Sequence, residues 1–114
     1  DARWASFEAD LQLLFQVRGV KDSSLAIVNQ NGDSLALSFA RTRGYEVLIT
    51  VSGSEAIALN HHLLSAGWLR RGDSNLEMRI SGTNLNNMVS RTKDLVLRTI
   101  REDLKLDLDR IRIL

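Results

Sequence analysis

The chain of 114 residues contains no cysteine and no proline. Without cysteine it can form no disulfide bond, no thiolate metal site and no thiol nucleophile. Without proline it has no cis-proline turn and no proline-rich linker. It also lacks an apolar run near the ~20 residues that a transmembrane helix requires, so we expect no membrane span. The lack of cysteine fits a reducing compartment, and we expect a cytoplasmic location.

An excess of charge of one sign is also missing. Fifteen Lys and Arg residues stand against fourteen Asp and Glu, and the formal net charge of +1 gives no overall field to attract nucleic acid or anionic lipid. The hydrophobic share of 44% is ordinary for a soluble globular protein. A chain of this length forms one domain that buries roughly two-thirds of its unfolded surface. We predict a single domain over 1–105 and a C-terminal arm or edge strand over 106–114.

The stretch 45–71 organises the predicted fold. It opens with an alternating set that is mostly β-branched or aromatic, namely Tyr45, Val47, Ile49 and Val51. Alternation with period two predicts a strand with this set on its buried face. Ser54 is suited to cap a following helix, and Gly67 is suited to end it in the left-handed conformation. Trp68 follows at once and is placed to pack over the end of that helix.

The patterns on either side predict further helices and strands. Asn31-Gly32 between two apolar runs is a strong hairpin signal, and Thr83 or Asn84 is suited to cap a last helix. The predicted elements are a helix at 1–18, strands at 24–30 and 33–40, a polar turn at 41–44, strands beginning at 68 and 76, and a helix over 84–104. Eight residues of the last helix form its predicted inward stripe, namely Leu85, Met88, Val89, Thr92, Leu95, Val96, Thr99 and Ile100.

Strands grouped in hairpins, with helices between the groups, are typical of an α+β domain with an antiparallel sheet. We predict a sheet of about five strands and three helices, in the order α-β-β-β-α-β-β-α, with a short C-terminal strand. In the tail the apolar parity flips between Leu108 and Ile111, so one flat strand cannot place both sets on one face. Either a turn or bulge near 109–110 restores the phase, or one half meets something else. We favour the second half as an edge strand or a partner-facing arm.

No pattern predicts catalysis. His61 and His62 are adjacent, and neighbouring helical residues point about 100° apart, so they cannot chelate one metal ion. The segment 71–73 (RGD) spells a tripeptide of adhesion loops, but a charged pair around glycine is also what a hairpin turn needs. The segment 52–54 (SGS) lacks the leading glycine of a nucleophile elbow and the lysine of a phosphate loop. We predict a protein that is not an enzyme and has no catalytic residue, metal site or cofactor.

Two regions are candidates for contact with a partner protein. Aromatic residues are enriched at interfaces, and the first predicted helix carries Trp4 and Phe7. The alternative is that this aromatic face covers the sheet. The tail adds apolar residues that one flat strand cannot bury together. The predicted partner-binding residues are Trp4, Phe7, Trp68, Leu108, Ile111 and Ile113.

Three segments carry a resemblance to a known family. They are 64–68 (LSAGW), similar to an L-x-x-x-G-W segment, 76–80 (LEMRI) after a polar turn, and 96–100 (VLRTI) within the long last helix. With the element order, they make residues 4–105 resemble the class I type III secretion chaperones and the YbjN-like, chaperone-like domains of bacteria. The chain departs from that pattern at 69–71, where prolines and an aromatic residue commonly follow Gly-Trp, and beyond Leu106. The resemblance implies a non-enzymatic homodimer that holds a partner polypeptide, and no functional residue is carried over.

Our leading hypothesis is a chaperone-like, self-associating domain that binds a protein or peptide. A nucleic-acid-binding αβ module is an alternative, because the last predicted helix is basic on its outward side. Acidic residues interrupt that face, however, and base-stacking aromatics are missing, so nucleic acid is not the expected partner. Two further alternatives are an accessory domain of a larger protein and an enzyme acting on a small molecule.

Overall fold

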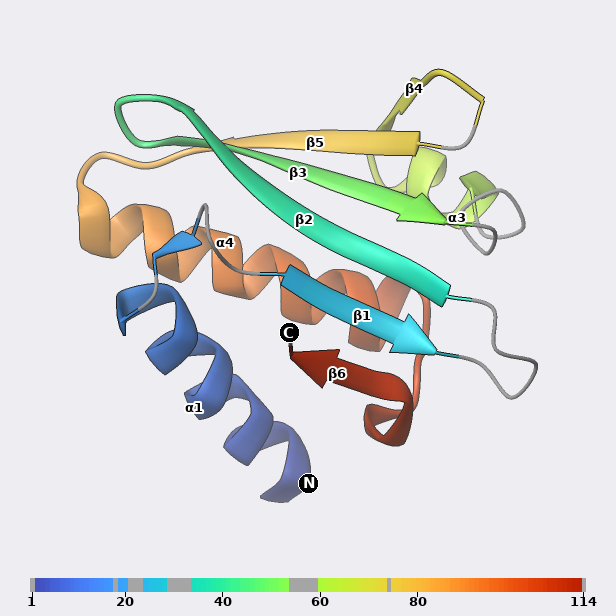
Figure 1. The fold of residues 1–114 in the computed structure, drawn as a ribbon, viewed down its shortest axis with the longest axis horizontal. Coiled ribbons are helices and arrows are strands. Elements are labelled where there is room, and N and C mark those ends of the chain that lie inside the picture. Colours follow the sequence, from blue (N-terminus) through green and yellow to red (C-terminus); the bar gives the residue numbers. More distant parts are fainter. Residues whose placement is uncertain are drawn as a thin grey trace.

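The computed structural model describes residues 2–17, 19–20, 24–28, 34–53, 60–73 and 75–113. The helices in these ranges are α1 (Ala2–Val17), α3 (Asn60–Ser65) and α4 (Leu85–Arg98). The strands are β1 (Ser24–Val28), β2 (Ser34–Arg43), β3 (Glu46–Gly53), β4 (Leu69–Arg71), β5 (Asn75–Ser81) and β6 (Ile111–Ile113). The arrangement, drawn in Figure 1, confirms the predicted α+β class with an antiparallel sheet and three helices. The predicted Asn31-Gly32 turn and Ser54 cap lie outside the described residues.

The strands form one six-stranded sheet in the order β4-β5-β3-β2-β1-β6. Every neighbouring pair is antiparallel. The first and last strands of the described chain lie side by side, and β4 and β6 form the two edges. The sheet therefore joins the N-terminal and C-terminal parts of the chain into one unit.

The turn between β2 and β3 differs from the prediction. β2 continues through 41–43, with a register irregularity between Arg41 and Arg43, and the turn falls at Gly44 and Tyr45. Gly44 has φ of 52°, a conformation that glycine adopts at little cost. Tyr45 is therefore exposed in the turn and does not lie on the buried face predicted for it.

The core lies on one face of the sheet. The buried strand residues alternate as expected and are Leu35, Leu37, Phe39, Val47, Ile49, Val51 and Leu76. α4 runs along this face and α1 packs beside α4 (Figure 1). Phe15 of α1 meets Phe39 edge to face at 5.3 Å, and Lys93 of α4 pairs with Glu8 of α1 at 3.2 Å. Both helices are thus tied to the same side of the sheet.

A Schellman motif ends α3, and Gly67 provides it as predicted. The Trp68 N–H donates to the Leu63 carbonyl at 3.0 Å, and the Gly67 N–H donates to Leu64 at 3.2 Å. Gly67 has φ of 102°, the left-handed conformation that this motif requires. The motif turns Trp68 inward, so that Trp68 and Leu63 are both buried.

α4 begins at a reciprocal cap. Asn84 accepts a hydrogen bond from the Asn87 N–H at 2.8 Å, and the Asn87 side chain accepts one from the Thr83 N–H at 2.9 Å. Six residues of the predicted inward stripe are buried, namely Met88, Val89, Thr92, Val96, Thr99 and Ile100. Leu95 packs partly against the core. Leu85 is 53% exposed, because the first turn of the helix carries it away from the core.

The flip of apolar parity in the tail is resolved by a turn. α4 passes into a π-helical turn (Thr99–Asp103), after which Leu104 and Leu106 are buried. A 3₁₀ turn (Leu108–Arg110) follows and leads into β6. The extra rotation returns Ile111 to the core side, where it packs partly against the core. Within the segment predicted as an arm or edge strand, Leu106 is a core residue and residues 111–113 form an edge strand of the sheet.

Candidate interaction surface

An apolar groove lies between α1 and β6. It has a volume of about 370 Å³ and is lined by Asp10, Leu13, Leu14, Val17 and Ile113. Leu13, Val17 and Ile113 are 59%, 77% and 38% exposed. We call this feature the α1–β6 groove. It concentrates exposed hydrophobic side chains of two elements that are far apart in the sequence.

The α1 residues of the groove lie on one side of that helix, and three of them, Leu13, Leu14 and Val17, are apolar. Positions 10, 13, 14 and 17 follow the spacing i, i+3, i+4, i+7, which places them on one helical face. Leu11 and Phe15 are the buried residues of α1 and point to the core. A helix at a protein surface ordinarily buries one apolar stripe and presents polar residues elsewhere. α1 thus carries apolar surface beyond what the fold itself covers.

β6 presents an edge beside this groove. Its three residues pair with β1 on one side, with Ile111 opposite Ile27, Arg112 opposite Ala26 and Ile113 opposite Leu25. In the described part of the chain no further strand pairs with the other side of β6. Because opposite residues of an antiparallel pair share a face, Ile111 and Ile113 lie on the helix-covered face and Arg112 lies on the open one.

The structure separates the six residues predicted to bind a partner. Trp68 was predicted to contact a partner, but it is 1% exposed and belongs to the core. Trp4 and Phe7 pack together edge to face at 6.0 Å and lie partly buried against the core, with Arg101 over the Trp4 ring at 5.2 Å.

The other three predicted residues come together at the end of the described chain. Leu108 lies half-buried in the 3₁₀ turn, Ile111 packs partly against the core, and Ile113 is exposed in the groove. The prediction missed Leu13 and Val17. Their i, i+4 spacing was a usable signal, because two apolar residues off the main stripe mark a second face.

A second cleft is polar and lies between α3 and the turn after α4. It measures about 380 Å³ and is lined by His62, Ser65, Ala66, Glu102, Asp103, Leu104 and Lys105. Asp103 Oδ2 is buried without a hydrogen-bond partner, and Arg98 Nε lies 3.8 Å from it. Among the described residues, no three His, Cys, Asp or Glu side chains lie close enough together to hold a metal ion.

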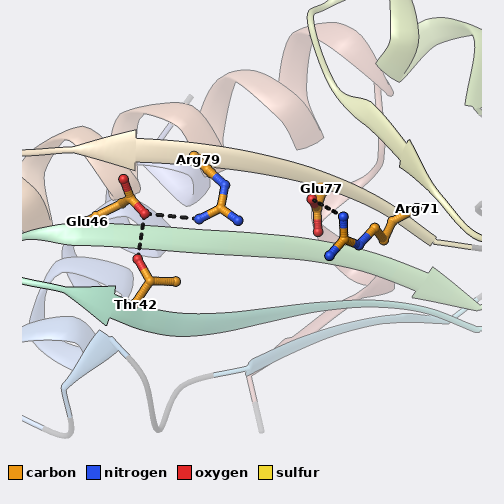
Figure 2. Close-up of polar contacts among 5 residues, drawn as sticks. All are labelled: Thr42, Glu46, Arg71, Glu77 and Arg79. Carbon is orange, nitrogen blue, oxygen red and sulfur yellow. Dashed lines mark hydrogen bonds and ion pairs between the residues drawn. The ribbon is translucent and has the colours of Figure 1, made fainter.

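The open face of the sheet carries cross-strand polar contacts, drawn in Figure 2. Thr42 Oγ1 donates to Glu46 Oε1 at 2.6 Å, and Arg79 Nη1 donates to the same oxygen at 3.0 Å. The hydrogen bond from Thr42 is the main cause that lowers the pKa of Glu46 from its ordinary value, desolvation opposes it, and Arg79 adds to the lowering. Arg71 and Glu77 form a longer ion pair at 3.9 Å. Paired charges and hydroxyls suit this face to contact with solvent.

Replacing Thr42 with valine is expected to raise the pKa of Glu46. The lowered pKa means that Glu46 stabilises the fold at pH values above its unfolded pKa, about 4.3, and that this contribution disappears as the pH falls through the folded pKa. Thr42→Val should therefore move acid unfolding to higher pH. An NMR titration of the Glu46 carboxyl carbon measures the pKa directly. Thr50→Val is the matched control on the same face, and equal Glu46 titration in wild type and Thr42→Val would contradict the prediction.

In the described part of the chain, no helix combines the length and the apolar character that crossing a bilayer requires. Comparison of the sequence and structure with protein-family models, with curated proteins and with solved structures found no match.

Proposed function

We propose that this chain is a non-enzymatic, chaperone-like protein-interaction domain that binds an extended polypeptide segment of a partner. The segment adds as a strand to the outer edge of β6 and lays apolar side chains in the α1–β6 groove. One observation carries the proposal: exposed apolar residues of α1 lie beside a strand edge that no other described strand pairs with. Strand addition is an established mode of peptide recognition, with main-chain hydrogen bonds along the edge and pockets for alternate side chains. The mode also accords with the family resemblance drawn from the sequence.

The groove is expected to contribute most of the affinity. β6 has three residues, so its edge offers few main-chain hydrogen bonds, each worth a net ~0.5–1.5 kcal/mol. Burying a Leu- or Val-sized side chain contributes about 1.5–3 kcal/mol. Leu13 and Val17 are largely exposed and gain most from being covered. Removing the apolar character of the groove should therefore weaken binding more than any change to the strand edge.

The opposite edge of the sheet is less suited to this role. β4 is also three residues long and exposed, with the sequence Leu69-Arg70-Arg71. Short edge strands with charged side chains discourage pairing with other chains. α1 lies at the β6 side of the sheet, away from β4 (Figure 1). The α1–β6 groove thus distinguishes the β6 edge from the β4 edge.

The centre of β6 favours a foreign segment over a second copy of the chain. A symmetric antiparallel pair of β6 strands centred on Arg112 would place the two Arg112 side chains directly opposite each other. Like charges in that position destabilise a strand pair. A homodimer formed through β6 is therefore disfavoured in this register, whereas a partner with a different residue opposite Arg112 avoids the repulsion.

The test uses phage-displayed random dodecapeptides selected on the folded chain, followed by titration of the selected peptides. Leu13→Asp should weaken binding at least ~10-fold, since a charge in the groove forfeits a contact of about 1.5–3 kcal/mol. Leu85→Asp is the matched control, because Leu85 is 53% exposed at the start of α4 and does not line the groove. Equal binding by Leu13→Asp and Leu85→Asp, or a failure to select any peptide, would contradict the proposal.

A further inference from the structure

The two faces that meet at β6 differ in their chemistry. On the helix-covered face, the groove is lined by four apolar side chains and one charged side chain. The apolar ones are Leu13, Leu14, Val17 and Ile113, and the charged one is Asp10. On the open face, β6 presents the exposed guanidinium of Arg112. A strand added beside β6 alternates its side chains between the same two faces. Each face therefore selects a different class of side chain in the partner.

Arg112 has no carboxylate partner among the residues that the structure describes. The row of register positions that begins at Arg112 continues across the sheet through Ala26, Ala36 and Ser52, none of which is charged. The neighbouring acidic residue Asp109 instead meets Arg3 at 3.5 Å. An acidic side chain opposite Arg112 would supply the opposite-charge cross-strand pair that this position lacks.

We infer that the bound segment carries an acidic residue opposite Arg112, flanked on both sides by apolar residues that enter the α1–β6 groove. This inference rests on the proposed function and specifies its ligand. Asp10 favours the same arrangement of side chains in the bound segment. A carboxylate that entered the groove would approach the negative charge of Asp10, whereas a carboxylate on the open face meets Arg112. The recognised pattern is apolar-acidic-apolar within an extended strand.

The same dodecapeptide library, selected in parallel on wild type and on Arg112→Glu, tests the inference. Wild type should enrich Asp or Glu between two apolar residues, and Arg112→Glu should enrich Lys or Arg at that position. In the best wild-type peptide, changing the acid to Gln should weaken binding by up to about 5-fold, and changing it to Lys should weaken it further. On Arg112→Glu the order of the three peptides should reverse.

Arg70→Glu is the matched control, because Arg70 is an exposed arginine at the centre of the other three-residue edge strand. It should leave the selected pattern and the order of affinities unchanged. Peptides that bind wild type, lose affinity with Leu13→Asp and show no preference for an acid would overturn this inference and leave the proposed function standing. Peptides whose affinity is unchanged by Leu13→Asp would overturn both.

Discussion

Replacing Trp68 with alanine is expected to lower the free energy of unfolding by about 3–5 kcal/mol. Trp68 is 1% exposed and is the largest of the fully buried side chains. It belongs to the hydrophobic core, so truncation would leave a cavity there. A typical domain has only about 5–15 kcal/mol of stability in total, so the variant should be severely destabilised. Urea unfolding followed by far-UV circular dichroism measures the change.

Two variants separate core packing from other effects at this site. Trp68→Phe keeps an aromatic ring and removes the indole N–H, which is buried without a hydrogen-bond partner, so it should lose much less stability than alanine. Trp4→Ala removes the same side chain from a partly buried position on α1 and should lose less than half as much. If Trp68→Ala unfolded at the same urea concentration as Trp4→Ala, Trp68 would not be the core residue described above.

Replacing Gly82 with alanine is expected to lower the free energy of unfolding by about 3 kcal/mol, near the upper end of overpacking effects. A Cβ at this position would lie 2.6 Å from the Met88 backbone nitrogen and 2.7 Å from the Met88 Cα. The contact is with the backbone of α4, which cannot move aside as a flexible side chain would. The Gly82 N–H also donates to the Tyr45 carbonyl at 3.0 Å, which holds the connection in place.

Thermal unfolding measures the effect of Gly82→Ala, and Ser81→Ala is its control. Ser81 is exposed at the end of β5, and its backbone carbonyl still accepts the hydrogen bond from Arg91 Nη1 after the substitution. Surface changes of this kind usually stay within about 0.5 kcal/mol. A Gly82→Ala variant as stable as Ser81→Ala would mean that α4 moves away from β5 without loss, contrary to the packing described here.

Periodicity in the sequence was sufficient to predict the elements that have one buried face. Val47, Ile49 and Val51 alternate, and Met88 and Val96 recur at helical spacing, because each element has a single covered side. The errors fall at element ends. Tyr45 leaves its strand because the glycine before it makes the turn, and Leu85 projects from the first turn of α4. A periodic pattern does not indicate where a helix or strand extends beyond the part of the protein that packs against it.

The candidate site was only partly predictable for a related reason. Of the residues that line the groove, Ile113 was among those predicted to contact a partner, from the break in parity. Leu13 and Val17 were not, since a helical pattern cannot show that a second group of apolar residues stays uncovered. Trp68 was predicted both to pack over the end of the helix and to contact a partner, because an aromatic residue after a helix-ending glycine can point either way; it is buried. The hydrogen bonds of the Schellman motif determine its inward direction. The pairing of β1 with β6 joins residues so distant in the sequence that no local pattern predicts it.

The place of β1 between β2 and β6 has a consequence for synthesis on the ribosome. Leu25 and Ile113 are register partners although their positions in the chain differ by 88. During vectorial synthesis β2 emerges soon after β1, but one flank of β1 stays unpaired until residues 111–113 have left the exit tunnel. Contacts this distant in sequence slow folding and prolong the exposure of a strand edge. In the nascent chain the unpaired edge of β1 is therefore exposed to aggregation for a time. In the folded protein that edge is covered by β6, a shorter strand, which then forms the edge of the sheet.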